Sequence, residues 1–214
     1  MSELEDLKRR IDQLESLEQI RQLPAKYALS VDMRNFDAVA NLFVEDVTVS
    51  RSKQGRQAMK EWYSSVLRGP LIGSAHGVAG HIIDLEGPDL ATGLVYSRND
   101  LETASTWMIE MMAYLDRYER RDGIWYFQRR TPLYWYQCDI TNPPLGGGEN
   151  KLRWEGQEWT AGAFHDAFPT WAEFWANADA GKGPVKPPAP LHRFLETFRG
   201  TGGPPRVNAS PNKH

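Results

Sequence analysis

Three side chains in the first half of the chain have the chemistry of an acid–base site: Tyr27, Asp32 and His76. A carboxylate that accepts a hydrogen bond from one imidazole nitrogen fixes the tautomer and raises the basicity of the other nitrogen. A phenol nearby can donate to a substrate oxygen. Brought together, the three side chains could remove a proton from a substrate and assist the departure of an oxygen.

Each of these residues also has an ordinary structural interpretation. Tyr27 lies on the apolar stripe of a predicted helix, where a core tyrosine is common. Asp32 falls in the last turn of that helix, where the dipole disfavours a carboxylate, and it could simply face water. His76 stands beside small residues at a strand start. Five helical residues turn through about 500°, so Tyr27 and Asp32 share a pocket only if it wraps the end of the helix.

The sequence contains no recognisable motif for a phosphate, a dinucleotide or a metal ion. Glycines 146–148 lack the flanking strand and helix of a nucleotide-binding loop. His76 and His81 are five residues apart on a predicted strand, so they should point to opposite faces and not share a metal ion. The single cysteine, Cys138, excludes an internal disulfide and a cysteine-based metal site. We therefore predict that any catalysis uses side chains alone, without a cofactor or metal.

The composition is that of a globular domain of 214 residues, of which 41% are hydrophobic and 25% are charged. The net charge of -3 and the lack of a Lys/Arg cluster argue against a nucleic-acid partner. No apolar run approaches the roughly 20 residues of a membrane span, and the charged N-terminus is not a signal peptide. We therefore expect a cytoplasmic protein with a small-molecule substrate and no membrane partner.

Helical periodicity dominates the first third of the chain. Residues 3–22 place leucine or isoleucine at positions 4, 7, 11, 14 and 17, which predicts a helix that packs on its own domain or on a partner subunit. Pro24 suits the first turn of a second helix, which should end near Asp32. Asn35 is the expected N-cap of a short helix that follows. A brief strand at 46–50 precedes another amphipathic helix at 54–67.

From residue 76 the hydrophobic period becomes that of strands. Residues 76–102 predict two strands around the turn EGPD, and residues 106–137 predict two long strands joined at RDG. Helices followed by an antiparallel meander indicate an α+β fold, in which the helices cover one face of a curved sheet.

The second face of such a sheet would also need a cover. The predicted strands carry large apolar residues that could form it, namely Met108, Met111, Tyr114 and Trp135. The simplest partner for an exposed apolar face is another copy of the chain, so we expect a homodimer or a homotrimer.

The chain changes character after Gln137, which divides it into a domain of residues 1–137 and a C-terminal extension of residues 138–214. The extension is rich in proline and glycine but also holds Trp154, Trp159, Phe164, Phe168, Trp171, Phe174 and Trp175. It could pack outside the sheet or across an oligomer interface. It could instead form a lid over a pocket for a flat substrate, which the aromatic side chains slightly favour. As part of a lid, His165 could reach the site, although a helix surface position is its ordinary interpretation.

Four segments appear in a familiar order: KYALSVD at 26–32, DVTVS at 46–50, AHGVAG at 75–80 and YERRDGIWYF at 118–127. Together they resemble the SnoaL-like, scytalone dehydratase-like family over roughly residues 8–137. The resemblance implies a cone-shaped α+β barrel of the nuclear transport factor 2-like fold, with N-terminal helices packed on a curved antiparallel sheet. Relatives include bile-acid 7α-dehydratase, scytalone dehydratase, hexachlorocyclohexane dehydrochlorinase and cofactorless lignin-dimer formaldehyde lyases.

The resemblance also implies roles for single residues. The helix aspartate of the family falls on Asp32 and its strand histidine on His76. The tyrosine of the dehydratases falls on Tyr27, where the dehydrochlorinase has a lysine. These three are the expected catalytic residues.

The remaining positions are expected to bind the substrate. A late-strand arginine of the bile-acid enzyme would fall near Tyr134, so Arg129 or Arg130 could substitute for it from a neighbouring position. Trp62 and His81 complete the set of expected substrate-binding residues.

The activity implied is that of a cofactor-independent lyase that abstracts a proton and eliminates a group from a bulky aromatic or polycyclic hydroxylated compound. Dehydration and a C–C cleavage that releases formaldehyde both fit. An isomerase or cyclase could use the same acid–base groups, and many relatives of this fold only bind ligands. The coincidence of tyrosine, aspartate and histidine favours an enzyme over a non-catalytic small-molecule-binding module.

Overall fold

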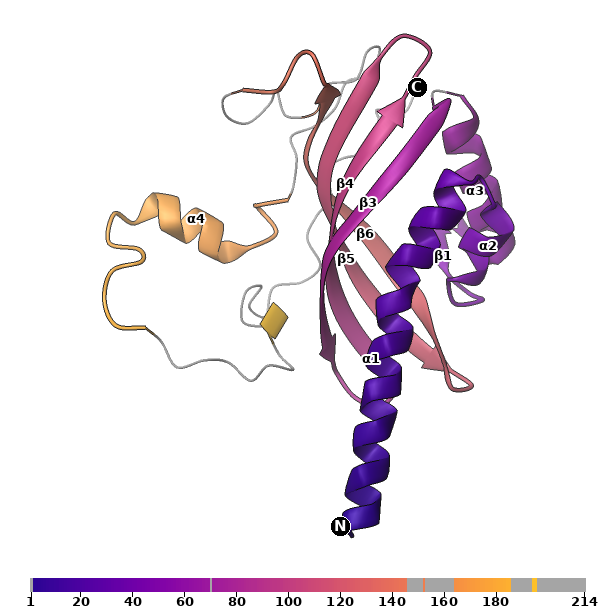
Figure 1. Ribbon diagram of the computed structural model, residues 1–214, viewed down its shortest axis with the longest axis vertical. Coiled ribbons are helices and arrows are strands. Elements are labelled where there is room, and N and C mark those ends of the chain that lie inside the picture. The colour runs from indigo at the N-terminus through magenta and orange to yellow at the C-terminus, as the bar shows by residue number, and fades with distance from the viewer. Residues whose placement is uncertain (1, 70, 146–151, 153–163, 186–193, 196–214) are drawn as a thin grey trace.

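The computed structural model describes residues 2–69, 71–145, 152, 164–185 and 194–195. Within this part of the chain, three N-terminal helices lie on one face of a four-stranded antiparallel sheet, and segments of the C-terminal extension lie on the other face (Figure 1). The predicted α+β architecture, with helices first and a meander after them, is therefore confirmed.

The first helix, α1, is continuous from Glu3 to Asp32, whereas the sequence predicted two helices separated near Pro24. Ser2 and Glu5 form a capping box at its start. A proline inside a helix costs about 3 kcal/mol, but this one lies on the side of α1 that is buried against the domain. The buried residues on that side are Ser16, Ile20, Leu23, Pro24, Tyr27, Ala28 and Val31. Burial of this face keeps the helix intact through the proline.

Two short helices and a small hairpin follow α1. Helix α2 spans Phe36–Asn41, and the side chain of its N-cap, Asn35, accepts a hydrogen bond from the first turn as predicted. Strands β1, Thr48–Ser50, and β2, Lys53–Gln54, form a two-stranded sheet that leads into α3, Arg56–Arg68. No helix in the described segments is long and apolar enough to cross a membrane.

The main sheet is a meander in the order β3-β4-β5-β6. Its strands are β3, Gly73–Leu85; β4, Leu90–Glu102; β5, Trp107–Arg121; and β6, Ile124–Asp139. The β5–β6 turn has positive φ at both Asp122 (51°) and Gly123 (79°), which is what a type I′ hairpin requires. The Asp-Gly signal in the sequence therefore located this hairpin correctly.

Each face of the sheet has its own hydrophobic cluster. The inner cluster, between the sheet and the helices, includes Tyr27, Phe43, Met112, Tyr114, Tyr118 and Phe127. The outer cluster contains Leu94, Ala113, Leu115 and Leu133 of the sheet with Phe164 and Leu195 of the extension. Met108 is also buried. The prediction that Met108 and Tyr114 form an exposed face was therefore wrong, because alternation along β5 turns Tyr114 into the inner cluster and the extension covers part of the outer face.

The described parts of the extension lie on the outer face and not over the inner side of the sheet. The backbone N–H of Phe164 donates to the carbonyl of Tyr134 at 3.0 Å, and the N–H groups of Phe194 and Leu195 donate to the carboxylate of Asp84 at 3.1 and 2.7 Å. Of the two interpretations of the extension, these contacts favour packing outside the sheet for the described residues. Trp154 and Trp159 lie outside the described residues.

Helix α4, Pro169–Ala176, follows the outer-face contact and has no buried residue (Figure 1). His165 stacks on Trp171, with 4.0 Å between the ring centroids, and meets Trp135 edge-on. His165 is therefore occupied by aromatic contacts on the outer face and does not join Tyr27, Asp32 and His76.

Loss of the Phe164 ring is expected to uncover the outer cluster. In Phe164→Ser, the apolar surface of Leu94, Leu115 and Leu133 becomes accessible, so the protein should bind more of a hydrophobic fluorescent dye and aggregate at a lower temperature. Phe174→Ser is the matched control, because Phe174 is exposed on α4. Equal dye binding and equal aggregation temperatures for the two variants would contradict the assignment.

Candidate active site

Asp32, the last residue of α1, holds the beginning of β3 through three hydrogen bonds. Its Oδ1 lies 2.7 Å from Nδ1 of His76 and accepts a hydrogen bond from Ser74 Oγ at 2.9 Å. Its Oδ2 accepts the backbone N–H of His76 at 2.9 Å. Strand β3 is an edge strand, so this N–H would otherwise lack a partner. The two residues that the sequence singled out as a pair are thus brought together.

The geometry sets the tautomer of the neutral imidazole. A carboxylate only accepts hydrogen bonds, so Nδ1 of His76 carries a proton, and in the neutral ring Nε2 presents its lone pair. Burial alone would raise the pKa of Asp32, but the hydrogen bonds from His76 and Ser74 hold that pKa below its ordinary value. Among the described residues, Nε2 of His76 has no hydrogen-bond partner. The imidazole is therefore arranged as a base with one free nitrogen.

Tyr27 meets the same imidazole from the side. Its ring lies edge-on to His76, with 6.2 Å between the centroids and an angle of 87° between the planes. Its hydroxyl lies 2.9 Å from the hydroxyl of Tyr63 on α3. Burial raises the pKa of Tyr27, so the phenol keeps its proton at neutral pH. Tyr27, Asp32 and His76 therefore gather at one place, although two of them are five residues apart on a helix.

Arg130 brings a buried positive charge to this group. Its Nε and Nη2 each lie 3.0 Å from one carboxylate oxygen of Asp116, and both side chains are buried. The guanidinium also lies over three rings, 3.9 Å from the centroid of Tyr114, 4.4 Å from that of Tyr27 and 4.6 Å from that of Phe127. Such contacts stabilise a cation that has lost its water. Arg130 is thus the arginine that reaches the site.

His76 and His81 both lie on the inner side of β3, so the prediction that they face opposite sides was wrong. The pairing register shifts between Val78 and His81, because a β-bulge adds one residue to β3 there. With one extra residue between them, two side chains that are five positions apart in the sequence point to the same face of the sheet. Sequence alternation alone cannot reveal a bulge, and here it misplaced one histidine.

His81 does not share a metal cluster with His76; it ends a chain of hydrogen bonds that begins at Arg130. Its Nε2 lies 3.0 Å from the hydroxyl of Tyr118, and that hydroxyl donates to Asp116 at 2.9 Å. Burial lowers the pKa of His81 to about 4, and the positive charge of Arg130 acts in the same direction. His81 is therefore neutral and positions Tyr118. Within the described residues, no group of three or more His, Cys, Asp or Glu side chains could hold a metal ion.

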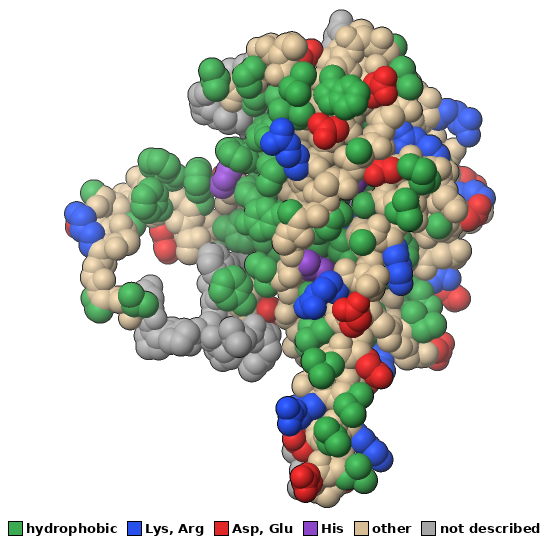
Figure 2. Space-filling view, in the orientation of Figure 1, with side chains coloured by type: hydrophobic (Ala, Val, Ile, Leu, Met, Phe, Trp, Pro, Cys, Tyr) green, Lys and Arg blue, Asp and Glu red, His purple; other side chains and the backbone are tan. Residues whose placement is uncertain are grey.

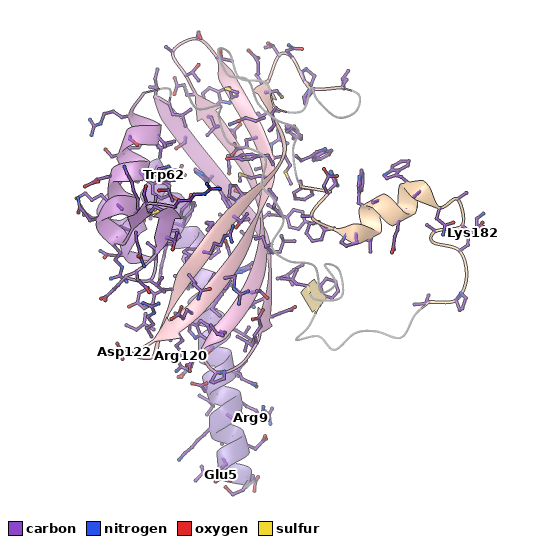
Figure 3. The ribbon with its side chains drawn as sticks, turned by 180° about the vertical axis from the view of Figure 1, so that it is seen from behind. Glu5, Arg9, Trp62, Arg120, Asp122 and Lys182 are labelled. Atoms are coloured by element: carbon purple, nitrogen blue, oxygen red, sulfur yellow. The ribbon has the colours of Figure 1, made fainter. Side chains whose placement is uncertain are left out.

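A cleft of about 950 Å³ opens between α3 with the β1–β2 hairpin on one side and β5 with β6 on the other. Its lining includes Tyr27, Tyr63, Tyr114, Arg130 and Tyr134. The half-exposed Trp62 of α3, labelled in Figure 3, also lines it, as does the exposed Arg129. Asp32 and His76 do not line this cleft. Tyr27 links the two, because it lines the cleft and contacts His76.

Sequence reasoning missed a row of polar residues that crosses the sheet beside His76. Asn99, Glu110 and Gln137 stand opposite one another on β4, β5 and β6, and Asn99 stands opposite His76. Asn99 Nδ2 donates to Glu110 at 2.5 Å and Gln137 Nε2 donates to the same carboxylate at 2.9 Å. Burial raises the pKa of Glu110, and the hydrogen bond from Asn99 opposes that rise. The sequence signal that could have revealed this row is the occurrence of polar residues at alternate positions within otherwise apolar strands.

A sequence model described as the SnoaL-like domain matches residues 12–131. The solved structure of a hexachlorocyclohexane dehydrochlorinase from Novosphingobium barchaimii is similar, with a TM-score of 0.57, 19% identity, and coverage of 62% of this chain and 95% of that chain. A scytalone dehydratase-like protein from Novosphingobium aromaticivorans has a TM-score of 0.53, 22% identity, and coverage of 65% and 99%. No curated protein matches the chain in sequence.

A third similar structure is that of an NTF2-like protein with a cystatin-like fold, also from Novosphingobium aromaticivorans. It is 27% identical to the present chain, with a TM-score of 0.51, and the match covers 62% of this chain and 90% of that chain. The structural similarities show that residues of the helices and the sheet adopt the cone-shaped fold that the sequence predicted.

Removal of the negative charge that faces Arg130 is expected to destabilise the protein strongly. Asp116→Asn leaves a buried guanidinium without a counter-ion, which should lower the free energy of unfolding by about 3 kcal/mol in urea titrations. The matched control is Glu86→Gln, which removes the carboxylate of a half-exposed pair with Arg117 and should leave the midpoint nearly unchanged. Equal midpoints for both variants would show that the Arg130 charge needs no partner.

The buried neutral imidazole of His81 should make the protein less stable as the pH falls. Between about pH 6.5 and pH 4 the unfolded chain binds a proton at His81 and the folded protein does not. The free energy of unfolding should therefore fall by up to roughly 3 kcal/mol across this range and be unaffected by His81 above it. His81→Gln, compared with the unchanged protein in urea titrations at several pH values, should remove this part of the slope. Parallel slopes would count against a neutral His81.

Proposed function

Because the chain belongs to the SnoaL-like domain family, we propose that it is a cofactor-independent lyase, which abstracts a proton from a bulky hydroxylated aromatic or polycyclic compound and expels a group from it. The observation that carries this proposal is the Asp32–His76 pair. Nδ1 of the imidazole is engaged by the carboxylate at 2.7 Å, which leaves Nε2 as a base. We assign the reaction to residues 1–137, which hold every side chain of the site.

In a dehydration, Nε2 of His76 takes the proton from the carbon next to the one that carries the hydroxyl group. The carbon–hydrogen electron pair becomes the new double bond, and the carbon–oxygen bond breaks. The proton of the Tyr27 phenol goes to the departing oxygen, which leaves as water. Asp32 stabilises the imidazolium that forms, because the carboxylate is held by hydrogen bonds from Ser74 and the His76 backbone in addition to the ring.

Arg130 makes Tyr27 a better acid in this reaction. A phenolate at Tyr27 would face a guanidinium 4.4 Å from its ring, and the neighbouring hydroxyl of Tyr63 could donate to it at 2.9 Å. Both contacts favour the charged form of the phenol, in opposition to the effect of burial. The proton can return to Tyr27 from the imidazolium or from solvent after the product leaves.

The same groups support a C–C cleavage of a 1,3-diol. His76 would take the proton of a primary hydroxyl, whose oxygen forms the carbonyl of formaldehyde as the C–C bond breaks. The released electron pair forms an alkene and expels the second hydroxyl group, which receives the proton of Tyr27 and leaves as water. Both reactions move one proton to His76 and one from Tyr27, so both belong to the proposed chemistry.

The cleft supports an aromatic or polycyclic substrate. Its lining includes four tyrosine rings and Trp62 beside charged side chains, and a volume of about 950 Å³ is of the size that accommodates a drug-sized molecule. Flat rings stack on such side chains, and the phenolic hydroxyls offer hydrogen bonds to substrate oxygens. The names of two similar structures, a dehydrochlorinase and a scytalone dehydratase-like protein, also belong to elimination chemistry.

The test is a turnover assay without added cofactor on two panels, polycyclic β-hydroxy ketones and diaryl 1,3-diols. A new conjugated double bond, followed by absorbance, reports elimination, and a colorimetric assay reports formaldehyde. Product from either panel supports the lyase, and formaldehyde identifies the C–C cleavage. Saturable binding of panel compounds with no product from any of them would support a binding module and overturn the proposal.

Loss of either member of the pair is expected to abolish most turnover without unfolding the protein. Asp32→Asn keeps the shape of the side chain but retains only one of the two acceptor oxygens, and it loses the charge that supports the imidazolium. His76→Ala loses the base itself, and removal of a general base lowers kcat by about 10²–10⁴-fold. Circular dichroism checks the fold, and His165→Ala, outside the site, is the control. Near-full turnover by His76→Ala would remove the mechanism.

A further inference from the structure

The N-terminal half of α1 extends beyond the rest of the domain. Figure 1 shows this end of the helix projecting past the sheet, and Figure 3 places Glu5 and Arg9 beyond Asp122 in the β5–β6 turn. Hydrophobic side chains are visible on the projecting part in Figure 2. The large exposed hydrophobic residues in this part of α1 are Leu4, Leu7, Ile11 and Leu14, which are between 46% and 67% exposed. Exposure of four large apolar side chains at one end of a helix is unfavourable, which suggests that another surface covers them.

This exposed stripe is not a continuation of the face that packs on the sheet. An α-helix turns about 100° per residue, which puts Leu4, Leu7, Ile11 and Leu14 within one narrow sector. The buried residues of the second half, Ile20, Leu23, Tyr27 and Val31, occupy a sector about 180° away. The apolar residues of α1 therefore lie on opposite sides of the helix in its two halves. The stripe of the first half faces away from its own domain.

The spacing of the stripe is that of a coiled coil. The intervals between successive members are three, four and three residues, so Leu4 and Ile11 occupy a positions and Leu7 and Leu14 occupy d positions of two heptads. The second heptad, with Ile11 at a and Leu14 at d, has the combination that favours two strands. A stripe of this kind is the narrow seam of a helix pair, not the broad face of a helix on a sheet.

The charged residues beside the seam would face opposite charges if two identical helices paired. In this register Glu3 and Arg10 occupy g positions, and Lys8 and Glu15 occupy e positions. A parallel pair would place Glu3 against Lys8 of the partner subunit and Arg10 against Glu15 of the partner subunit, both of opposite sign. An antiparallel pair would match Glu3 with Arg10 of the partner subunit, and Lys8 with Glu15 of the partner subunit. Within the described residues, none of the four side chains forms an ion pair.

We propose that residues 3–17 of α1 pair with the same segment of a second copy of the chain to form a short two-stranded coiled coil. A second copy fits because every charge beside the seam finds its opposite in an identical helix. Two heptads are few for isolated peptides, since a helix must first nucleate. Here the capping box at Ser2 and the packing of the second half of α1 already hold the helix, so association need not order it.

The first test replaces the d positions. Leu7→Glu/Leu14→Glu places like charges in the seam, and the self-association constant of the full chain should fall by at least about 100-fold in sedimentation experiments over a micromolar dilution series. Leu29→Glu is the matched control, because Leu29 is a leucine of the same helix, 65% exposed and outside the two heptads. An association unaffected by the double substitution, or a monomeric unchanged protein, would overturn the proposal.

Charge exchange gives a second test that does not depend on the seam leucines. Arg10→Glu removes an attraction and should weaken the association while circular dichroism stays unchanged. In a parallel pair, addition of Glu15→Arg should restore it, and in an antiparallel pair addition of Glu3→Arg should do so. Restoration by either exchange supports pairing with a second copy and reveals its direction. Weakening that neither exchange restores, or no weakening at all, would overturn the coiled coil.

Discussion

The structure depends on a guanidinium buried in the middle of the cone. A positive charge without water needs a counter-ion and polarisable neighbours, and Arg130 has both. Asp116, directly opposite on the next strand, accepts two hydrogen bonds from it, and the rings of Tyr27, Tyr114 and Phe127 surround it. Because these partners come from α1, β5 and β6, one charge constrains the register of two strands and the position of a helix across them.

The candidate site follows from the same constraint. With Tyr27 held against the guanidinium, α1 lies along the edge strand β3, and its last residue, Asp32, reaches the start of that strand. The Asp32 carboxylate then accepts a hydrogen bond from a backbone N–H at the sheet edge, and the same carboxylate orients the imidazole of His76. Asp32 therefore both provides a hydrogen-bond acceptor for the sheet edge and orients His76 as a base. The same side chain contributes to the stability of the fold and to the proposed chemistry.

The two faces of the sheet have separate tasks. Alternation along β5 sends Tyr114 and Asp116 to the inner face, where the cleft and the buried charges lie, and sends Leu115 to the outer cluster with Phe164. The outer cluster stabilises the sheet from behind without entering the cleft. Helix α1 also has two apolar surfaces, but they follow one another along its length. The apolar residues of the first half lie on the opposite side of the helix from those of the second half.

Local periodicity, turn chemistry and short motifs were enough to predict the order of the helices and strands and the hairpin at Asp122, and they singled out Tyr27, Asp32 and His76 as candidate residues. The remaining features depend on long-range contacts. Which arginine enters the core, and that His81 faces inward, depend on strand register and on a bulge, neither of which leaves a local signal.

The position of the extension and the continuity of α1 through its proline were also decided by tertiary structure. Aromatic residues after Gln137 suit a lid and an outer layer equally well, and only the clusters that they join distinguish the two. A proline predicts a helix end unless burial of the helix face outweighs its cost, and that burial is provided by residues far away in the chain. Local sequence specifies what each segment can form, and long-range packing selects among those forms because its free energies exceed the local preferences.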